Sequence, residues 1–172
     1  MRLALYQPDI PPNTGTILRL AACMGLAVDI IEPCGFPFSE KSLRRSGLDY
    51  LDHVRIRQHL SFEDFQVWRR AAGHRLLLLS TKAAEPYTEC RYELDDILMV
   101  GRESSGVPAE VFEAVDKQIV IPMPGGLRSL NVAVAASMVL GEALRQQGCF
   151  EVSEDNTIGT SPSDNPAAIP GD

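Results

Sequence analysis

Several motifs that would assign this chain to a common enzyme class are missing from its sequence. There is no G-x-G-x-x-G motif and no Walker A motif, so neither dinucleotide nor ATP binding has support. There is no nucleophile elbow, and the three histidines lie outside the polar loops of the chain, so no hydrolase triad is visible. The four cysteines form no C-x-x-C pair and have no histidine at metal-ligand spacing, which argues against a metal site.

Long hydrophobic runs are also absent. No run approaches membrane-spanning length, and the apolar N-terminal segment ends at Pro8, too early for a signal peptide. We therefore expect a soluble cytoplasmic protein with reduced thiols and no membrane partner. A chain of 172 residues is one domain by size, and we expect a single folded domain over residues 1–150. Residues 151–172 are rich in Ser, Pro, Asp, Asn and Gly, which predicts a disordered acidic tail.

The formal net charge of −7 argues at first against a nucleic-acid partner. The charge is uneven, because five of the 23 acidic residues follow Phe150 and residues 1–150 carry 18 acidic and 16 basic groups. Within residues 41–75 the balance reverses, with eight basic and four acidic residues. This segment is either a basic patch for phosphate groups or a set of scattered surface arginines, and the sequence leaves both interpretations open.

Short apolar runs alternate with helical patterns along the chain. Strand character lies at residues 3–6, 27–31, 52–56, 75–80, 96–100 and 118–121, and helical patterns lie at 14–24, 62–72, 108–114 and 130–146. Strands that alternate with helices and are apolar on both faces predict an α/β fold. We expect a mostly parallel sheet with helices on both faces.

Three polar loops of this pattern lie next to apolar strands or helices. One contains Asn13, the second runs from Gly101 to Gly106 around Glu103, and the third holds Ser129 and Asn131. In open α/β sheets, ligands bind outside the carboxyl ends of the strands, so these loops are expected to line one pocket. The glycines of the second loop could also serve only to turn the chain. At the third loop we expect Ser129 to be the helix N-cap, which would leave the Asn131 carboxamide free for a ligand.

Arg19 lies in an otherwise apolar stretch of the first expected helix. Its neighbours Ile17, Leu18 and Leu20 are apolar, so the guanidinium needs an anionic partner or a route to water. It either extends to the surface or reaches an anion bound near Asn13 at the start of the helix.

The three loops occur in a specific order and spacing. They are, in chain order, Asn13-x-Gly15-x-x-x-Arg19, then Gly101-x-Glu103-x-x-Gly106, then Ile121-Pro122-Met123 followed by Ser129-Leu130-Asn131. Together they resemble the three motifs of the SPOUT RNA methyltransferases. Residues 6–15, 31–33 and 43–50 are most similar to the small single-domain members, which methylate the ribose 2′-hydroxyl of the tRNA wobble nucleotide, cytidine or uridine. The resemblance covers residues 2–147.

The resemblance implies an α/β fold with a C-terminal trefoil knot that binds S-adenosylmethionine, the methyl donor, which leaves as S-adenosylhomocysteine. On the matching positions, the donor would lie among Leu79, Gly101, Ile121 and Ser129. Glu103 would stabilise the loop or the positive charge of the donor.

The resemblance also implies the catalytic residues and the partners. Asn131 would anchor the site, Asn13 would position the nucleotide, and Arg19 would act on the 2′-hydroxyl proton. Because a guanidinium rarely loses its proton, we favour Arg19 as an electrostatic clamp that lowers the pKa of the hydroxyl. Arg44 and Arg45, in the similar segment 43–50, are expected to bind tRNA, and the substrate site is expected to be shared between two subunits of a homodimer.

Two other functions remain open from the sequence. The chain could be an enzyme of the same superfamily that acts on another RNA or on a base, or a non-catalytic nucleotide- or RNA-binding α/β module. Arg19 and Asn131 favour an enzyme, because a binding module has no need of both beside one pocket.

Overall fold

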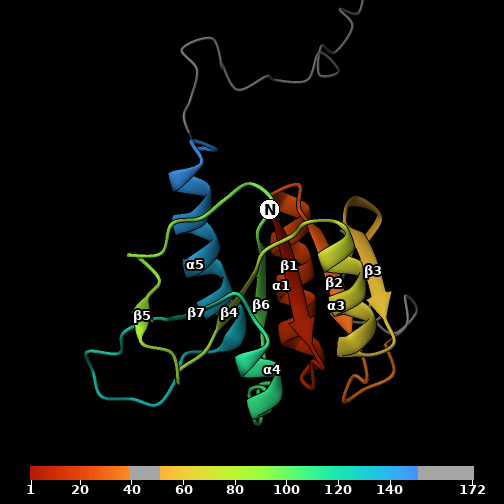
Figure 1. Cartoon of the computed structure of the whole chain (residues 1–172), viewed down its shortest axis with the longest axis horizontal. Coiled ribbons are helices and arrows are strands. Elements are labelled where there is room, and N and C mark those ends of the chain that lie inside the picture. Colours follow the sequence, from red (N-terminus) through yellow and green to blue (C-terminus); the bar gives the residue numbers. More distant parts are fainter. Residues whose placement is uncertain (39–50, 151–172) are drawn as a thin grey trace, which may run out of the picture.

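The structure is a computed structural model that describes residues 1–38 and 51–150 (Figure 1). A seven-stranded sheet has the order β3-β2-β1-β6-β4-β7-β5, and neighbouring strands in it are parallel. This confirms the predicted α/β class. The predictions for Arg44, Arg45 and the tail over 151–172 lie outside the described residues.

The elements alternate along the chain much as the sequence pattern predicts. The strands are β1 (Arg2–Tyr6), β2 (Ala27–Ile31), β3 (Arg55–His59), β4 (Leu76–Leu79), β5 (Glu85–Pro86), β6 (Ile97–Val100) and β7 (Lys117–Val120). The helices are α1 (Pro11–Cys23), α3 (Phe62–Ala71), α4 (Ala109–Glu113) and α5 (Val132–Gln146), and η1 (Leu51–His53) is a short 3₁₀ helix.

The predicted strand over residues 52–56 is wrong by three residues, since residues 51–53 form η1 and β3 begins at Arg55. The apolar Val54 and Ile56 suggested the earlier position. β3 lies at the edge of the sheet, where Arg55, Arg57 and Gln58 remain exposed. Its sequence is therefore too polar to show the pattern of a buried strand.

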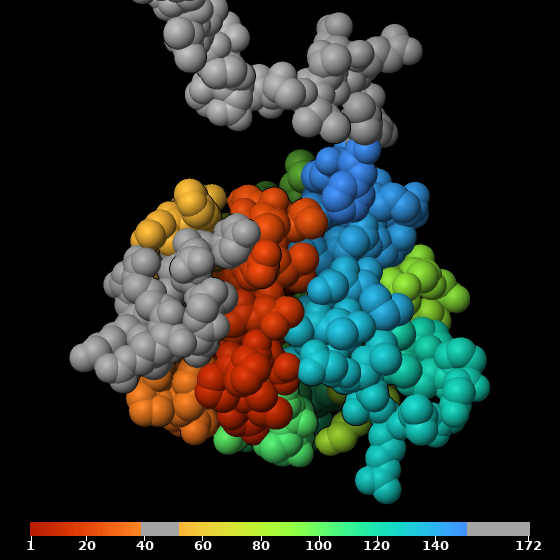
Figure 2. Space-filling view, turned by 180° about the vertical axis from the view of Figure 1, so that it is seen from behind, coloured from red at the N-terminus to blue at the C-terminus, as the bar shows by residue number. Residues whose placement is uncertain are grey.

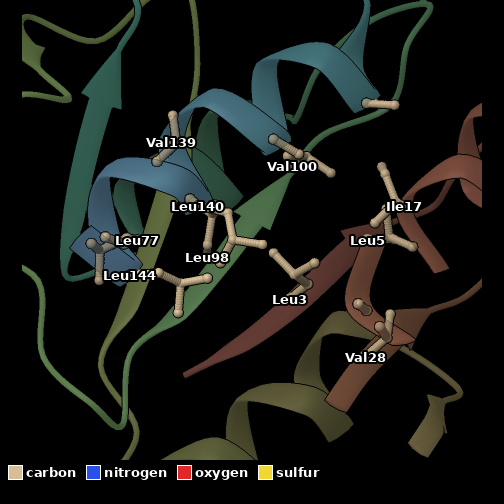
Figure 3. Close-up of a cluster of buried hydrophobic side chains, with 14 of the residues drawn as sticks. Leu3, Leu5, Ile17, Val28, Leu77, Leu98, Val100, Val139, Leu140 and Leu144 are labelled. Atoms are coloured by element: carbon tan, nitrogen blue, oxygen red, sulfur yellow. The ribbon is translucent and has the colours of Figure 1, made fainter. Parts of the chain in front are cut away.

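Helices cover both faces of the sheet, as predicted, and each face has its own apolar core. Successive residues of β1 alternate between the two cores: Leu3 and Leu5 pack with α1 and α5, whereas Ala4 and Tyr6 pack with α3 and α4. Figure 3 shows the first core, in which side chains of α5 meet those of the central strands. On this side of the molecule α1 and α5 lie next to each other (Figure 2).

Some arginines of the predicted basic segment serve the fold. Arg69 is 3% exposed, and its Nη1 lies 2.6 Å from Asp116 Oδ2. Arg75 Nη2 donates to Asp96 Oδ2 at 2.7 Å, and the Arg57 guanidinium lies 4.6 Å from the centre of the Trp68 ring. Arg69 and Arg75 are therefore not part of a free phosphate-binding patch, because a buried or paired guanidinium is already neutralised.

The core packing gives a first prediction. Leu98 is fully buried in β6, between β1 and β4, so Leu98→Ala should lower the free energy of unfolding by about 2–5 kcal/mol in urea denaturation. Val67→Ala on α3, where Val67 is 72% exposed, should change the same quantity by less than about 0.5 kcal/mol. Equal effects of the two substitutions would contradict the described packing.

Candidate functional site

A cavity of about 600 Å³ opens at the carboxyl ends of β4, β6 and β7. Its floor is apolar, with Leu78, Leu79, Val100 and Ile121 contributed by these strands or the residues just after them. Three loops and the starts of α1 and α5 form the walls. The location is the one that parallel sheets offer to ligands, because loops there present backbone groups next to buried side chains.

Most of the sequence-predicted site residues line this one cavity. They are Asn13, Leu79, Gly101, Glu103, Ile121, Ser129 and Asn131. Arg19 does not line it: the residue is exposed on α1, on the outward side that also carries Pro12, Thr16 and Cys23. The helix turns Arg19 away from the direction of Asn13, since six residues correspond to about one and two-thirds turns.

The loop after β6 closes on itself. Arg102 N–H donates to Gly106 O at 3.0 Å and Gly106 N–H donates back to Arg102 O at 2.8 Å, with Gly106 at a φ of +70°. A Cβ on Gly101 would lie 2.8 Å from the carbonyl carbon of Gly106. Glycine is therefore required at position 101 for the loop to reach this shape.

The start of α5 corrects one prediction. Asn131, not Ser129, is the N-cap: Asn131 Oδ1 accepts from Ala133 N–H at 2.9 Å and from Val134 N–H at 3.4 Å. Ser129 lies too far before the first turn to reach these donors. Asn131 Nδ2 donates to Asn13 Oδ1 at 2.9 Å, so the Asn131 carboxamide is committed to the protein and is not free for a ligand.

Glu103 connects this pair to the loop before α1. Glu103 Oε1 accepts from Asn13 Nδ2 at 3.2 Å, and Glu103 Oε2 accepts from the Asp9 N–H at 3.1 Å. Burial and the contact with the side-chain carboxyl group of Asp9 raise the pKa of Glu103, whereas the same side-chain contact lowers the pKa of Asp9 to about 2. The site thus holds two adjacent carboxyl groups with opposite shifts.

Sequence reasoning missed several residues of this region. Ser80, Thr81 and Lys82 follow β4 and line the cavity, and Arg102 lies between the two predicted residues of the loop after β6. The first three could have been found, because a polar run directly after a buried parallel strand lies at the same sheet edge as the other loops. Asp9 could not, since nothing in its local pattern indicates contact with residues 103 and 104.

Within residues 1–38 and 51–150, no three His, Cys, Asp or Glu side chains are grouped so that they could hold a metal ion. None of the helices in the same ranges is long and apolar enough to cross a membrane.

Comparison with known proteins identifies relatives over nearly all of the described chain. Residues 1–141 match the SpoU rRNA Methylase family. A protein of Beijerinckia indica subsp. indica named tRNA (cytidine(34)-2'-O)-methyltransferase is 59% identical over 148 residues, which cover 86% of this chain and 92% of that protein. A solved structure concerned with the 2-OH methylation of C/U34 on tRNA is 41% identical, with a TM-score of 0.78 and coverage of 86% and 96%. An AdoMet-bound rRNA methyltransferase from Sinorhizobium meliloti is 29% identical, with a TM-score of 0.74 and coverage of 84% and 55%.

Gly101 offers a test of the cavity. Gly101→Ala should force the loop after β6 to open and weaken binding of S-adenosylhomocysteine at least about 10-fold in calorimetry. Gly125→Ala is the matched control, because a Cβ there meets nothing within 4 Å, and its binding should stay within about twofold of wild type. Wild-type affinity in Gly101→Ala would separate this loop from ligand binding.

Proposed function

This chain belongs to the SpoU rRNA methylase family, and on that basis we propose that it methylates the ribose 2′-hydroxyl of the tRNA wobble nucleotide with S-adenosylmethionine as donor. The observation that carries the proposal is the 59% identity, over 92% of its length, to a protein named for this activity on cytidine 34. The solved relative concerned with C/U34 supports either pyrimidine as the target base.

The cavity fits the donor in size and chemistry. Its volume of about 600 Å³ lies in the range of small-molecule sites. The apolar floor of Leu79 and Ile121 suits the faces of an adenine ring, and the backbone of the loops at Gly101 and Ser129 can bond its edge. When bound, S-adenosylmethionine supplies a methyl group already activated by the sulfonium, so the protein needs only to position the ribose and manage one proton.

The residues of the chain divide this work. Asn131 holds the start of α5 and the orientation of Asn13, and Asn13 faces the cavity, where we assign it to positioning the nucleotide. Glu103 fixes the Nδ2 side of the Asn13 carboxamide. Arg19 remains our candidate for the 2′-hydroxyl: its permanent positive charge lowers the pKa of a hydroxyl held beside it and so eases loss of the proton.

We propose that the enzyme is a homodimer in which Arg19 serves the cavity of the second subunit. Arg19 lies on the outward side of α1 and not in the cavity of its own chain, which supports an action across subunits. The neighbouring α5 presents Val134 and Met138 outward, 50% and 40% exposed and one turn apart. A surface with apolar side chains at this spacing suits helix packing against a second copy.

We also propose that the C-terminal part forms the trefoil knot expected from the resemblance. α5 packs in the core above β6, and the segment between β5 and β6 crosses its last turns (Figure 1). There Gln146 Nε2 donates to Cys90 O at 3.0 Å and Gln147 Nε2 donates to Glu93 O at 3.1 Å. A helix enclosed between the sheet and an earlier segment is the arrangement that threading requires.

We also propose that residues 1–150 form one methyltransferase domain followed by an acidic tail, that Arg44 and Arg45 bind tRNA phosphates, and that the protein is cytoplasmic, where a tRNA substrate is found. The match to the family over residues 1–141 supports the first of these. The second is tested by replacing both arginines by alanine, which should weaken tRNA binding and reduce the slope of its salt dependence by up to about two units.

The activity is tested with purified protein, S-adenosylmethionine and unmodified tRNA, followed by mapping of ribose methylation. We expect a 2′-O-methyl group at the wobble nucleotide and none on a base. Arg19→Ala should bind S-adenosylhomocysteine like wild type yet lose methyl transfer by at least ~10²-fold, and Arg19→Lys should not restore it. Methylation of ribosomal RNA instead, or wild-type rates in Arg19→Ala, would refute the respective assignments.

The subunit arrangement is tested by mixing two impaired variants, assayed at an S-adenosylmethionine concentration too low to fill the cavity of Gly101→Ala. Arg19→Ala keeps its cavity, and Gly101→Ala keeps its arginine, so a mixed dimer has one complete site only if Arg19 acts across the interface. Unfolding and refolding the variants together should restore about a quarter of wild-type activity, since random pairing gives half mixed dimers with one site of two. Each variant refolded alone is the control, and no recovery in the mixture would place Arg19 in the site of its own chain.

A further inference from the structure

Asp9 lies where three segments of the chain meet beside the cavity. The Asp9 N–H donates to Glu103 Oε2, and the Glu103 N–H donates back to Asp9 Oδ1, each at 3.1 Å. The Ser104 hydroxyl donates to Asp9 Oδ2. On the other side Gly35 N–H donates to Pro8 O at 2.9 Å, and a Cβ on Gly35 would lie only 2.7 Å from Asp9 Cβ. The Asp9 side chain is thus held in one position between Gly35 and Glu103, which lie 26 and 94 positions away in the sequence.

The hydrogen bonds that lead from Asp9 into the cavity have a fixed direction. Because Asn131 Oδ1 caps α5, Asn131 Nδ2 must face Asn13, and Asn13 Oδ1 must accept from it. This leaves Asn13 Nδ2 as a donor to Glu103 Oε1. Glu103 must therefore accept at both oxygens, from Asn13 on one and from Asp9 N–H on the other.

Asp9 also controls the charge around Glu103. Asp9 receives the backbone and hydroxyl donors of the opposite loop, and Arg102 Nε lies 3.7 Å from Asp9 Oδ2 while Arg102 Nη1 donates to Gln7 at 3.3 Å. Burial raises the pKa of Glu103, and the neighbouring Asp9 carboxyl group raises it further. The groups that face Glu103 are Asp9 from the loop before α1, Asn13 from α1, and Arg102 across Asp9.

We propose that Asp9 is a positioning residue of the methyl-transfer site. It clamps the loop after β6 to the loop before α1, so that Glu103 stays an acceptor for Asn13 and Asn13 stays turned toward the nucleotide. The proposal rests on the function proposed above, and it concerns the orientation of Asn13 and not the binding of the donor, whose walls at Leu79 and Ile121 lie on other strands.

The test compares Asp9→Asn with two other variants of the full chain. Asp9→Asn should lower kcat for tRNA about 10-fold or more, because small shifts of positioning groups have large effects on rate, and S-adenosylhomocysteine affinity should stay within about twofold. The acidic limb of the pH–kcat profile should move to lower pH, since Glu103 loses the neighbour that raises its pKa. Ser104→Ala keeps the Asp9 charge, so it should lower kcat by less and leave the limb in place. Glu113→Gln, which removes an exposed negative charge on α4, is the control and should match wild type.

A second readout does not depend on activity. Carbon-13 carboxyl NMR, with the Glu103 signal assigned from Glu103→Gln, should give a lower pKa of Glu103 in Asp9→Asn than in wild type. If wild type methylates no tRNA, the proposed function fails while this titration still decides the link between Asp9 and Glu103. An unchanged Glu103 titration overturns the proposal, and so does a parallel loss of donor affinity, folding stability and activity in Asp9→Asn, which would indicate a purely structural residue.

Discussion

The hydrogen bond from Asn131 Nδ2 to Asn13 Oδ1 joins the starts of α1 and α5 across 118 residues, and the geometry of the cavity depends on it. It exists because the two helices begin in different ways. α1 begins with Pro11 and Pro12, which have no N–H to satisfy, and it has no side-chain cap. Asn13 is therefore available for the cavity. α5 has no acidic residue in its first turn and relies on Asn131 for two of its N–H groups, which leaves only the amide nitrogen of Asn131 to face α1.

The fold could be predicted from the sequence wherever a buried element consists of apolar residues. The four leucines of β4 and the apolar run of β6 identify central strands because both faces of a parallel sheet are covered. The strands at the two edges of the sheet were harder to predict. The predicted position of β3 was three residues too early, because an edge strand needs few apolar residues to mark it. The two-residue β5 was not predicted, because Glu85 and Pro86 carry no strand pattern and are tolerated only beside β7 at the edge.

The candidate site also has a part that could be predicted from the sequence and a part that could not. Its strand-end and loop residues, such as Leu79, Gly101 and Ser129, could be grouped in advance because all parallel strands end at one edge. The hydrogen bonds made by the polar side chains of the site could not be predicted. Whether Asn131 or Ser129 is the N-cap depends on where α5 begins to within two residues. For Arg19 the sequence left two positions open, and the structure shows the exposed one: its immediate neighbours are apolar, but Pro12, Thr16 and Cys23 lie on its side of α1.

An acidic chain can still act on an RNA, because the attraction of a phosphate is local. At physiological salt, charges interact over about 8–10 Å, so carboxylates farther than this from the cavity matter little to a phosphate held there. The attraction of a phosphate depends on the cations that are not already paired with carboxylates in the folded protein. Arg69 and Arg75 are paired with carboxylates at the opposite ends of the strands, and Arg102 is paired with Asp9, whereas Lys82 lines the cavity and Arg128 is exposed next to Ser129. The net charge of the chain therefore does not predict whether a phosphate is attracted to this site, because that depends on the cations near it.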